Sequence, residues 1–108
     1  MEKRISERIH VSLAGELFSG GIPNDVIITD VSERGLCSII MTRNVPIDLM
    51  PQSKSNIAIQ LDTREIIYLS CEERWSNTIS NGLIKRIGWV INNPPEQYND
   101  LLKSLYDF

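Results

Sequence analysis

Two short motifs contain the residues whose types and spacing are suited to chemistry. The first places two arginines four residues apart, in Arg4-Ile-Ser-Glu-Arg8, and the second, Asp-x-Ser-x-x-Gly, comprises Asp30, Ser32 and Gly35. Taken singly, the first is an ordinary charged terminus. The second is an ordinary hairpin turn, in which Asp and Ser bond the local backbone and Gly adopts positive φ. Both motifs in this order arise by chance in roughly one per cent of chains this long, so these residues form the candidate site.

The remaining polar residues do not assemble into a catalytic or metal-binding constellation. His10 is the only histidine, and we expect it on the solvent face of a strand. No histidines or cysteines stand at the spacing of a metal site, no base is placed to activate Ser32, and no glycine-rich phosphate loop is present. We therefore predict that the protein is not an enzyme, has no catalytic residues and needs no metal or other cofactor.

Composition narrows the class of protein further. With 42% hydrophobic and 23% charged residues, the chain is predicted to be one folded domain spanning residues 1–108. A net charge of -3 and only 6% aromatic residues argue against binding RNA or single-stranded DNA, which needs a basic groove and stacking platforms. We find no membrane-spanning run and no signal peptide. Cys37 and Cys71 lack close pairing, so we expect reduced, buried thiols and a cytoplasmic protein.

The segments that position the candidate residues read as short strands. Alternating or β-branched apolar residues predict strands at 9–14, 26–31, 36–41, 57–61, 66–75 and 83–91. Polar turns are expected at 19–24 and 76–82, and a long proline-containing loop at 42–55. Glu73 breaks the alternation of its strand, which a β-bulge or a position at a barrel rim would explain. Six strands at short, regular spacing favour an antiparallel barrel or sandwich.

The end of the chain has a different periodicity. Asn93-Pro-Pro-Glu96 is typical of a helix start, with Asn93 as N-cap, prolines in the first turn and Glu96 at the third helical position. Apolar residues then follow at helical spacing: Tyr98, Leu101, Leu102 and Leu105. We expect an amphipathic helix over residues 93–107 that packs its apolar stripe on the β-structure.

Both motifs, in this order on a small barrel, resemble the PilZ domain, the bacterial receptor module for cyclic di-GMP (c-di-GMP). The resemblance covers essentially the whole chain, including the strand that ends in Trp75, the glycine-containing strand Ile87-Gly-Trp-Val-Ile91 and the terminal helix. It implies a six-stranded antiparallel β-barrel of PilZ type with a C-terminal α-helix. Residues 1–8 would be a ligand-binding arm, 9–92 the barrel and 93–107 the helix.

The chain departs from the family pattern at three places. Glu73 stands where an apolar residue is more usual, Ile91 replaces an aromatic residue, and the 42–55 loop carries no strong family signature. None of these positions falls in either motif, so the departures concern local packing and leave the candidate site intact.

The resemblance also implies a role for each motif residue. Arg4 and Arg8 would grip base and phosphate, since an arginine fork matches guanine O6 and N7 or phosphate oxygens. The Asp30 carboxylate suits the N–H edge of guanine, and the Ser32 hydroxyl can donate to phosphate. Gly35 would let the turn fold tightly and leave backbone open to the ligand. Two further cations are secondary candidates: Lys3 before the first motif and Arg34 inside the second.

The implied function is that of a c-di-GMP receptor or adaptor. Nucleotide binding would order the N-terminal arm and alter contact with an unidentified downstream protein, regulating motility, biofilm or exopolysaccharide output. Leu102, Tyr106 and Phe108 are candidates for that contact, with core packing as the other role for Leu102. The alternative is a PilZ-like interaction adaptor that binds no nucleotide. The sequence leaves open whether one or two ligand molecules bind, and the oligomeric state.

Overall fold

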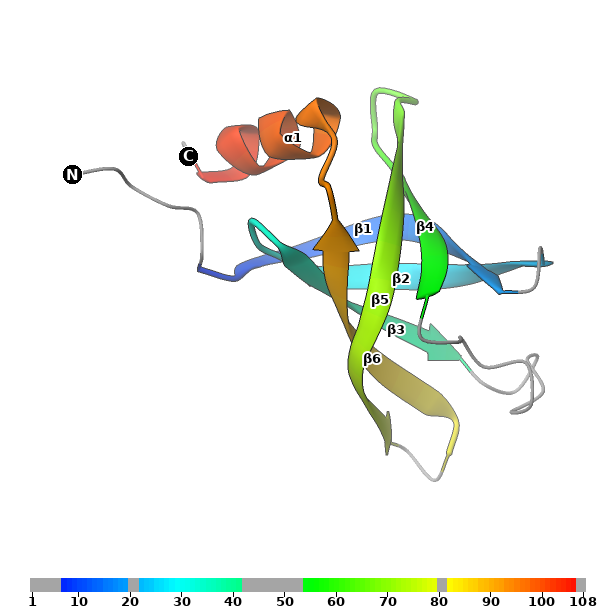
Figure 1. Ribbon diagram of the computed structural model, residues 1–108. Helices are drawn as coiled ribbons and strands as arrows, with labels where there is room; N and C mark the ends of the chain where they lie inside the picture. Colours follow the sequence, from blue (N-terminus) through cyan, green and yellow to red (C-terminus); the bar gives the residue numbers. More distant parts are fainter. Residues whose placement is uncertain (1–6, 20–21, 42–53, 80–81, 107–108) are drawn as a thin grey trace.

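The computed structural model describes residues 7–19, 22–41, 54–79 and 82–106. Its elements in chain order are β1 (Ile9–Ser19), β2 (Ile22–Val31), β3 (Gly35–Met41), β4 (Lys54–Gln60), β5 (Ile66–Ile79), β6 (Ile84–Asn92) and α1 (Glu96–Tyr106). The strands pair antiparallel in the order β1-β2-β3-β6-β5-β4, and β4 pairs with β1 to close the barrel (Figure 1). The predicted fold, a six-stranded barrel followed by a helix, is confirmed.

Alternating apolar side chains on the strands fill the barrel. The buried residues that form this core come from every strand and from α1: Leu17, Val26, Ile28, Val31, Leu36, Ile40, Ile57, Ile59, Ile67, Leu69, Cys71, Ile87, Trp89, Ile91, Tyr98 and Leu102. Period-2 alternation buries one face of each strand, which is why the apolar pattern locates them. From the helix, Tyr98 and Leu102 are fully buried in this core, and Leu101 and Leu105 are partly buried against it. The predicted apolar stripe is confirmed. In the described part of the chain no helix is long and apolar enough to span a membrane.

Two predicted turns are partly strand. β2 begins at Ile22, where the sequence predicted a turn, and pairs there with Ser19 of β1. β5 continues to Ile79 rather than ending at Trp75, because its polar residues pair with β6 as far as Ile79 opposite Ile84. The polar segment is therefore an exposed hairpin whose backbone hydrogen bonds are satisfied by the neighbouring strand. Most of the expected loop at 42–55 lies outside the described residues, and β4 already begins at Lys54.

The helix begins later than the sequence predicted. Asn93 has a φ of 48°, a left-handed conformation that an N-cap does not adopt. The first helical hydrogen bonds instead end on the Pro95 carbonyl, which accepts from Tyr98 N at 3.0 Å and Asn99 N at 3.3 Å. Pro95 thus occupies the N-cap position, Asn93 turns the chain between β6 and α1, and the described helix is Glu96–Tyr106.

A β-bulge accommodates Glu73, as predicted. The pairing of β5 with β6 shifts register between Glu73, opposite Trp89, and Trp75, opposite Gly88. Arg74 is the extra residue. The shift places the Trp75 indole against Gly88 on β6. A Cβ at Gly88 would lie 2.3 Å from Trp75 Nε1, so the indole occupies the space that a side chain would need. The bulge therefore explains both the odd glutamate and the glycine across from the tryptophan.

Candidate functional site

Asp30 owes its orientation to a second bulge. β2 pairs Ile28 with Ser38 and Asp30 with Cys37, so Thr29 is an extra residue on β2. Without it, Ile28 and Asp30 would share a face, because side chains two apart on a strand point the same way. With it, Ile28 and Val31 are both in the core, and Asp30 points to the other side of the sheet.

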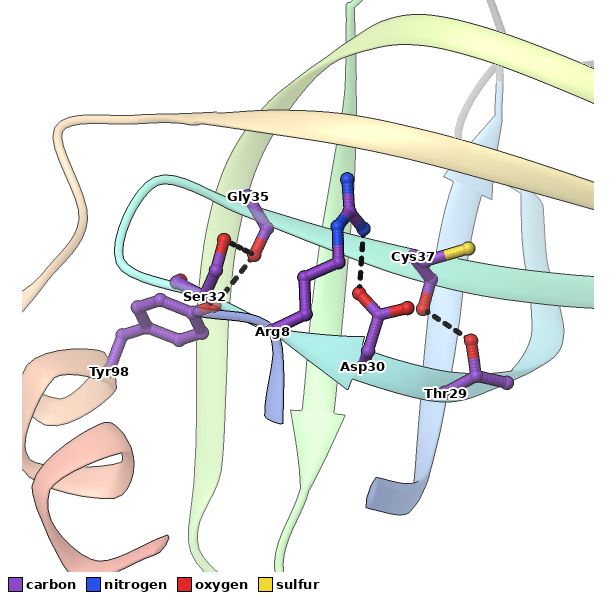
Figure 2. Close-up of polar contacts among 7 residues, drawn as sticks. All are labelled: Arg8, Thr29, Asp30, Ser32, Gly35, Cys37 and Tyr98. Atoms are coloured by element: carbon purple, nitrogen blue, oxygen red, sulfur yellow. Dashed lines mark hydrogen bonds and ion pairs between the residues drawn. The ribbon is translucent and has the colours of Figure 1, made fainter. Parts of the chain in front are cut away.

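Arg8 lies immediately before β1 and meets Asp30 across the strand pair (Figure 2). Its Nη1 donates to Asp30 Oδ1 at 2.9 Å. The Asp30 side chain is only 10% exposed, whereas that of Arg8 is 55% exposed. A guanidinium has five N–H donors, so the ion pair fixes the direction of Arg8 while other donors still face solvent. This arrangement suits an anionic or acceptor-rich ligand.

The turn between β2 and β3 is closed by its own polar groups. Ser32 N donates to Gly35 O at 2.8 Å, and Ser32 Oγ donates to the same carbonyl at 3.2 Å. The turn is also fastened to β6, because Ile91 N donates to Arg34 O at 2.8 Å. The Arg34 side chain is exposed. The backbone of this turn is thus fixed by hydrogen bonds within the turn and by one from β6.

Gly35 is required for close approach rather than for left-handed backbone. Among the described glycines only Gly82 has positive φ, so the hairpin interpretation of Gly35 is wrong on this point. A Cβ at Gly35 would lie 2.6 Å from the Trp89 carbonyl oxygen on β6. The glycine lets β3 and β6 come together beside the turn, with Gly35 opposite Val90.

Tyr98 is a site residue that sequence reasoning missed. Its hydroxyl donates to Ser32 O at 2.7 Å and lies 3.1 Å from Gly35 O, so α1 contacts the turn directly (Figure 2). The residue is fully buried, and burial raises the pKa of its phenol. The apolar stripe contained a signal, since a buried tyrosine hydroxyl usually needs a polar partner. The sequence could not indicate that the partner was 66 residues away.

The structure therefore brings together four of the predicted site residues: Arg8, Asp30, Ser32 and Gly35. Arg4 and Lys3 lie outside the described residues. His10 is exposed, as expected, and stands opposite Asp30 in the pairing of β1 with β2.

The cysteines and acidic residues suggest no second chemistry. Both cysteines are free and buried. Burial raises the pKa of the Cys71 thiol to about 12, which disfavours the reactive thiolate. Within the described ranges no three His, Cys, Asp or Glu residues are grouped so as to hold a metal ion.

Comparison with known proteins identifies the fold. No protein-family model and no curated protein matches the sequence. Several solved structures are similar to it, three of which follow. The inhibitor of motility MotI/DgrA of Bacillus subtilis has a TM-score of 0.74 at 12% identity, over 99% of this chain and 51% of its own. PlzA of Borreliella burgdorferi, solved with c-di-GMP, has a TM-score of 0.71 at 17% identity, over 94% and 50%.

The third structure is a single domain. The PilZ domain of YcgR from Escherichia coli, solved with c-di-GMP, has a TM-score of 0.69 at 14% identity and covers 98% of this chain and 93% of its own. This chain spans about half the length of the first two proteins and nearly all of this third one. The fold of this chain is therefore that of a PilZ domain.

Proposed function

We propose that this protein is a c-di-GMP receptor whose binding site is the outer surface formed by Arg8, Asp30 and the turn from Ser32 to Gly35. The observation that carries the proposal is the Arg8–Asp30 ion pair beside that turn, at 2.9 Å and with the guanidinium half exposed. It occurs in a fold that binds c-di-GMP in two of the similar structures.

The chemistry of c-di-GMP matches these groups. The ligand carries two phosphates and two guanines. The free N–H donors of Arg8 suit a phosphate or the O6 and N7 acceptors of guanine, and Asp30 has a second carboxylate oxygen for the N–H edge. In this proposal Ser32 donates to phosphate, and Gly35 lets β3 pack closely against β6 so that the turn keeps its place beside Arg8. Arg4 completes the clamp, with Lys3 and Arg34 as secondary contacts.

The proposed signal is a change of surface. The nucleotide would bridge the arm at residues 1–8 to the barrel and order it, which creates a new face for a downstream protein partner. Motility, biofilm formation and exopolysaccharide synthesis are the outputs that we propose for such a partner.

Calorimetric titration of c-di-GMP into the protein tests the proposal. We expect saturable binding in the micromolar range or tighter. Cyclic di-AMP is the matched control, because adenine presents an amino group where guanine presents O6 and should bind at least tenfold more weakly. No heat of binding at tens of micromolar c-di-GMP would refute the receptor function and favour the nucleotide-independent adaptor.

A further inference from the structure

The Tyr98 hydroxyl joins α1 to the turn that the proposed ligand occupies. It lies 2.7 Å from Ser32 O and 3.1 Å from Gly35 O, on the first turn of the helix. A phenol has a single proton, so it is shared between these two carbonyls. The side chain has no exposed surface, and no water can therefore replace either contact without opening the helix from the barrel.

Gly35 O receives more donors than it has lone pairs. Ser32 N donates at 2.8 Å, Tyr98 Oη lies at 3.1 Å and Ser32 Oγ at 3.2 Å, whereas a carbonyl oxygen has two lone pairs. The Ser32 hydroxyl is the most distant of the three donors and the only one on a partly exposed side chain that can rotate toward solvent. It is therefore the donor most easily redirected.

We propose that Tyr98 is a positioning residue that keeps Gly35 O hydrogen-bonded when the Ser32 hydroxyl turns away to a ligand phosphate, and that it thereby couples α1 to occupancy of the site. This inference rests on the proposed function. With Tyr98 in place, redirecting Ser32 leaves the carbonyl with two donors. Without the phenol hydroxyl, the same rotation leaves it with one, so Ser32 is held more firmly in the turn.

Coupling of this kind acts in both directions. If the docked helix favours the ligand-ready turn, the ligand must favour the docked helix by the same factor. The first turn of α1 should therefore exchange its amide hydrogens more slowly with nucleotide bound. The amide of Asn99, which donates to Pro95 O at 3.3 Å, reports this local opening.

The test compares Tyr98→Phe with Tyr68→Phe, the same substitution at a side chain that is 68% exposed on β5. We expect Tyr98→Phe to weaken c-di-GMP binding about five- to tenfold, the effect of one buried hydrogen bond, and Tyr68→Phe to change it less than twofold. Ser32→Ala then closes a double-mutant cycle. In the Ser32→Ala background, Tyr98→Phe should weaken binding less than twofold, because no hydroxyl remains to be released.

Several results would overturn the inference. One is wild-type affinity in Tyr98→Phe; another is a penalty that persists unchanged in the Ser32→Ala background, which is what a merely structural role of Tyr98 predicts. If Tyr98→Phe does not fold, the wild type supplies the test: nucleotide should slow exchange at Asn99 about fivefold or more, and unchanged exchange there refutes the coupling.

Failure of the proposed function gives a different pattern. If the wild type binds no c-di-GMP, the proposed function and the coupling to nucleotide are both refuted. Exchange of the Ser32 amide without nucleotide then still reports the link between helix and turn. Faster exchange in Tyr98→Phe than in Tyr68→Phe would show that the link exists but serves no c-di-GMP site.

Discussion

Replacing Arg8 with alanine should separate ligand affinity from stability. Among the residues that the structure describes, Arg8 has one ion-pair contact, to Asp30 at 2.9 Å, and its side chain is 55% exposed. Solvent screens such a pair, so its net contribution to the free energy of unfolding is about 1 kcal/mol or less. Asp30 keeps 10% exposure, which lets water reach the carboxylate after the substitution. We therefore expect Arg8→Ala to fold, with a melting temperature lowered by at most about 5 °C.

The loss in affinity should be larger. In the proposed complex the Arg8 fork makes two charge-assisted hydrogen bonds to base or phosphate, each worth roughly 1.5–3 kcal/mol. Allowing for the donors that water satisfies in the free state, the net loss is roughly 3 kcal/mol, or about 100-fold in Kd. Arg8→Lys keeps the charge without the planar fork, and its loss should fall between those of alanine and wild type.

Calorimetry measures the affinity of each variant for c-di-GMP, and thermal unfolding measures its stability. Arg64→Ala is the matched control, because Arg64 is an exposed arginine in the turn between β4 and β5, away from the β2–β3 turn (Figure 1). It should bind c-di-GMP as the wild type does. If Arg8→Ala bound within threefold of wild type, or if Arg64→Ala lost as much affinity, the reasoning that places the ligand at Arg8 would be refuted.

Three further predictions concern the scaffold of the site. Gly35→Ala should destabilise the fold by about 1–3 kcal/mol in denaturant titrations, because a Cβ would lie 2.6 Å from Trp89 O. Ser38→Ala should cost about 1–3 kcal/mol by the same measurement, because it removes the acceptor, at 3.0 Å, of the buried Trp89 Nε1. The exposed Ser70 is its control and should tolerate alanine within about 0.5 kcal/mol. Burial raises the pKa of Cys71 from 9.0 to about 12. The contribution of the neutral Cys71 thiol to the free energy of unfolding is therefore complete below pH 9 and is lost as the pH rises toward 12. That loss is up to roughly 1.4 kcal/mol per pH unit, and Cys71→Ala should make it shallower.

Each scaffold prediction has an outcome that contradicts it. A Gly35→Ala protein with wild-type stability would mean that β3 and β6 can separate at no cost. Equal effects of alanine at Ser38 and Ser70 would mean that the indole finds another acceptor. A pH profile that is unchanged in Cys71→Ala would assign the alkaline loss to other groups, including the buried Tyr98 phenol.

The sequence determined the strands and the helix, and it supplied the residue types of the candidate site. Period-2 alternation and runs of β-branched residues located all six strands, and helical spacing identified the stripe through Tyr98 and Leu102 that α1 buries. These signals are readable because burial of one face depends only on local periodicity. Of the two explanations predicted for the break at Glu73, a bulge or a position at the barrel rim, the pairing of β5 with β6 shows the bulge. The roles of Arg4, Arg8, Asp30, Ser32 and Gly35 as ligand contacts stay a prediction from the motifs.

Tertiary structure decided how the site residues meet. The extra residue at Thr29 turns Asp30 away from the core, and only then can Arg8, 22 positions earlier, reach it. Position 35 needs a glycine because β6 passes directly beside it. Tyr98 reaches the β2–β3 turn because the closed barrel brings α1 next to that turn. Register shifts and barrel closure depend on contacts between distant segments, so the local pattern of a single sequence does not contain them.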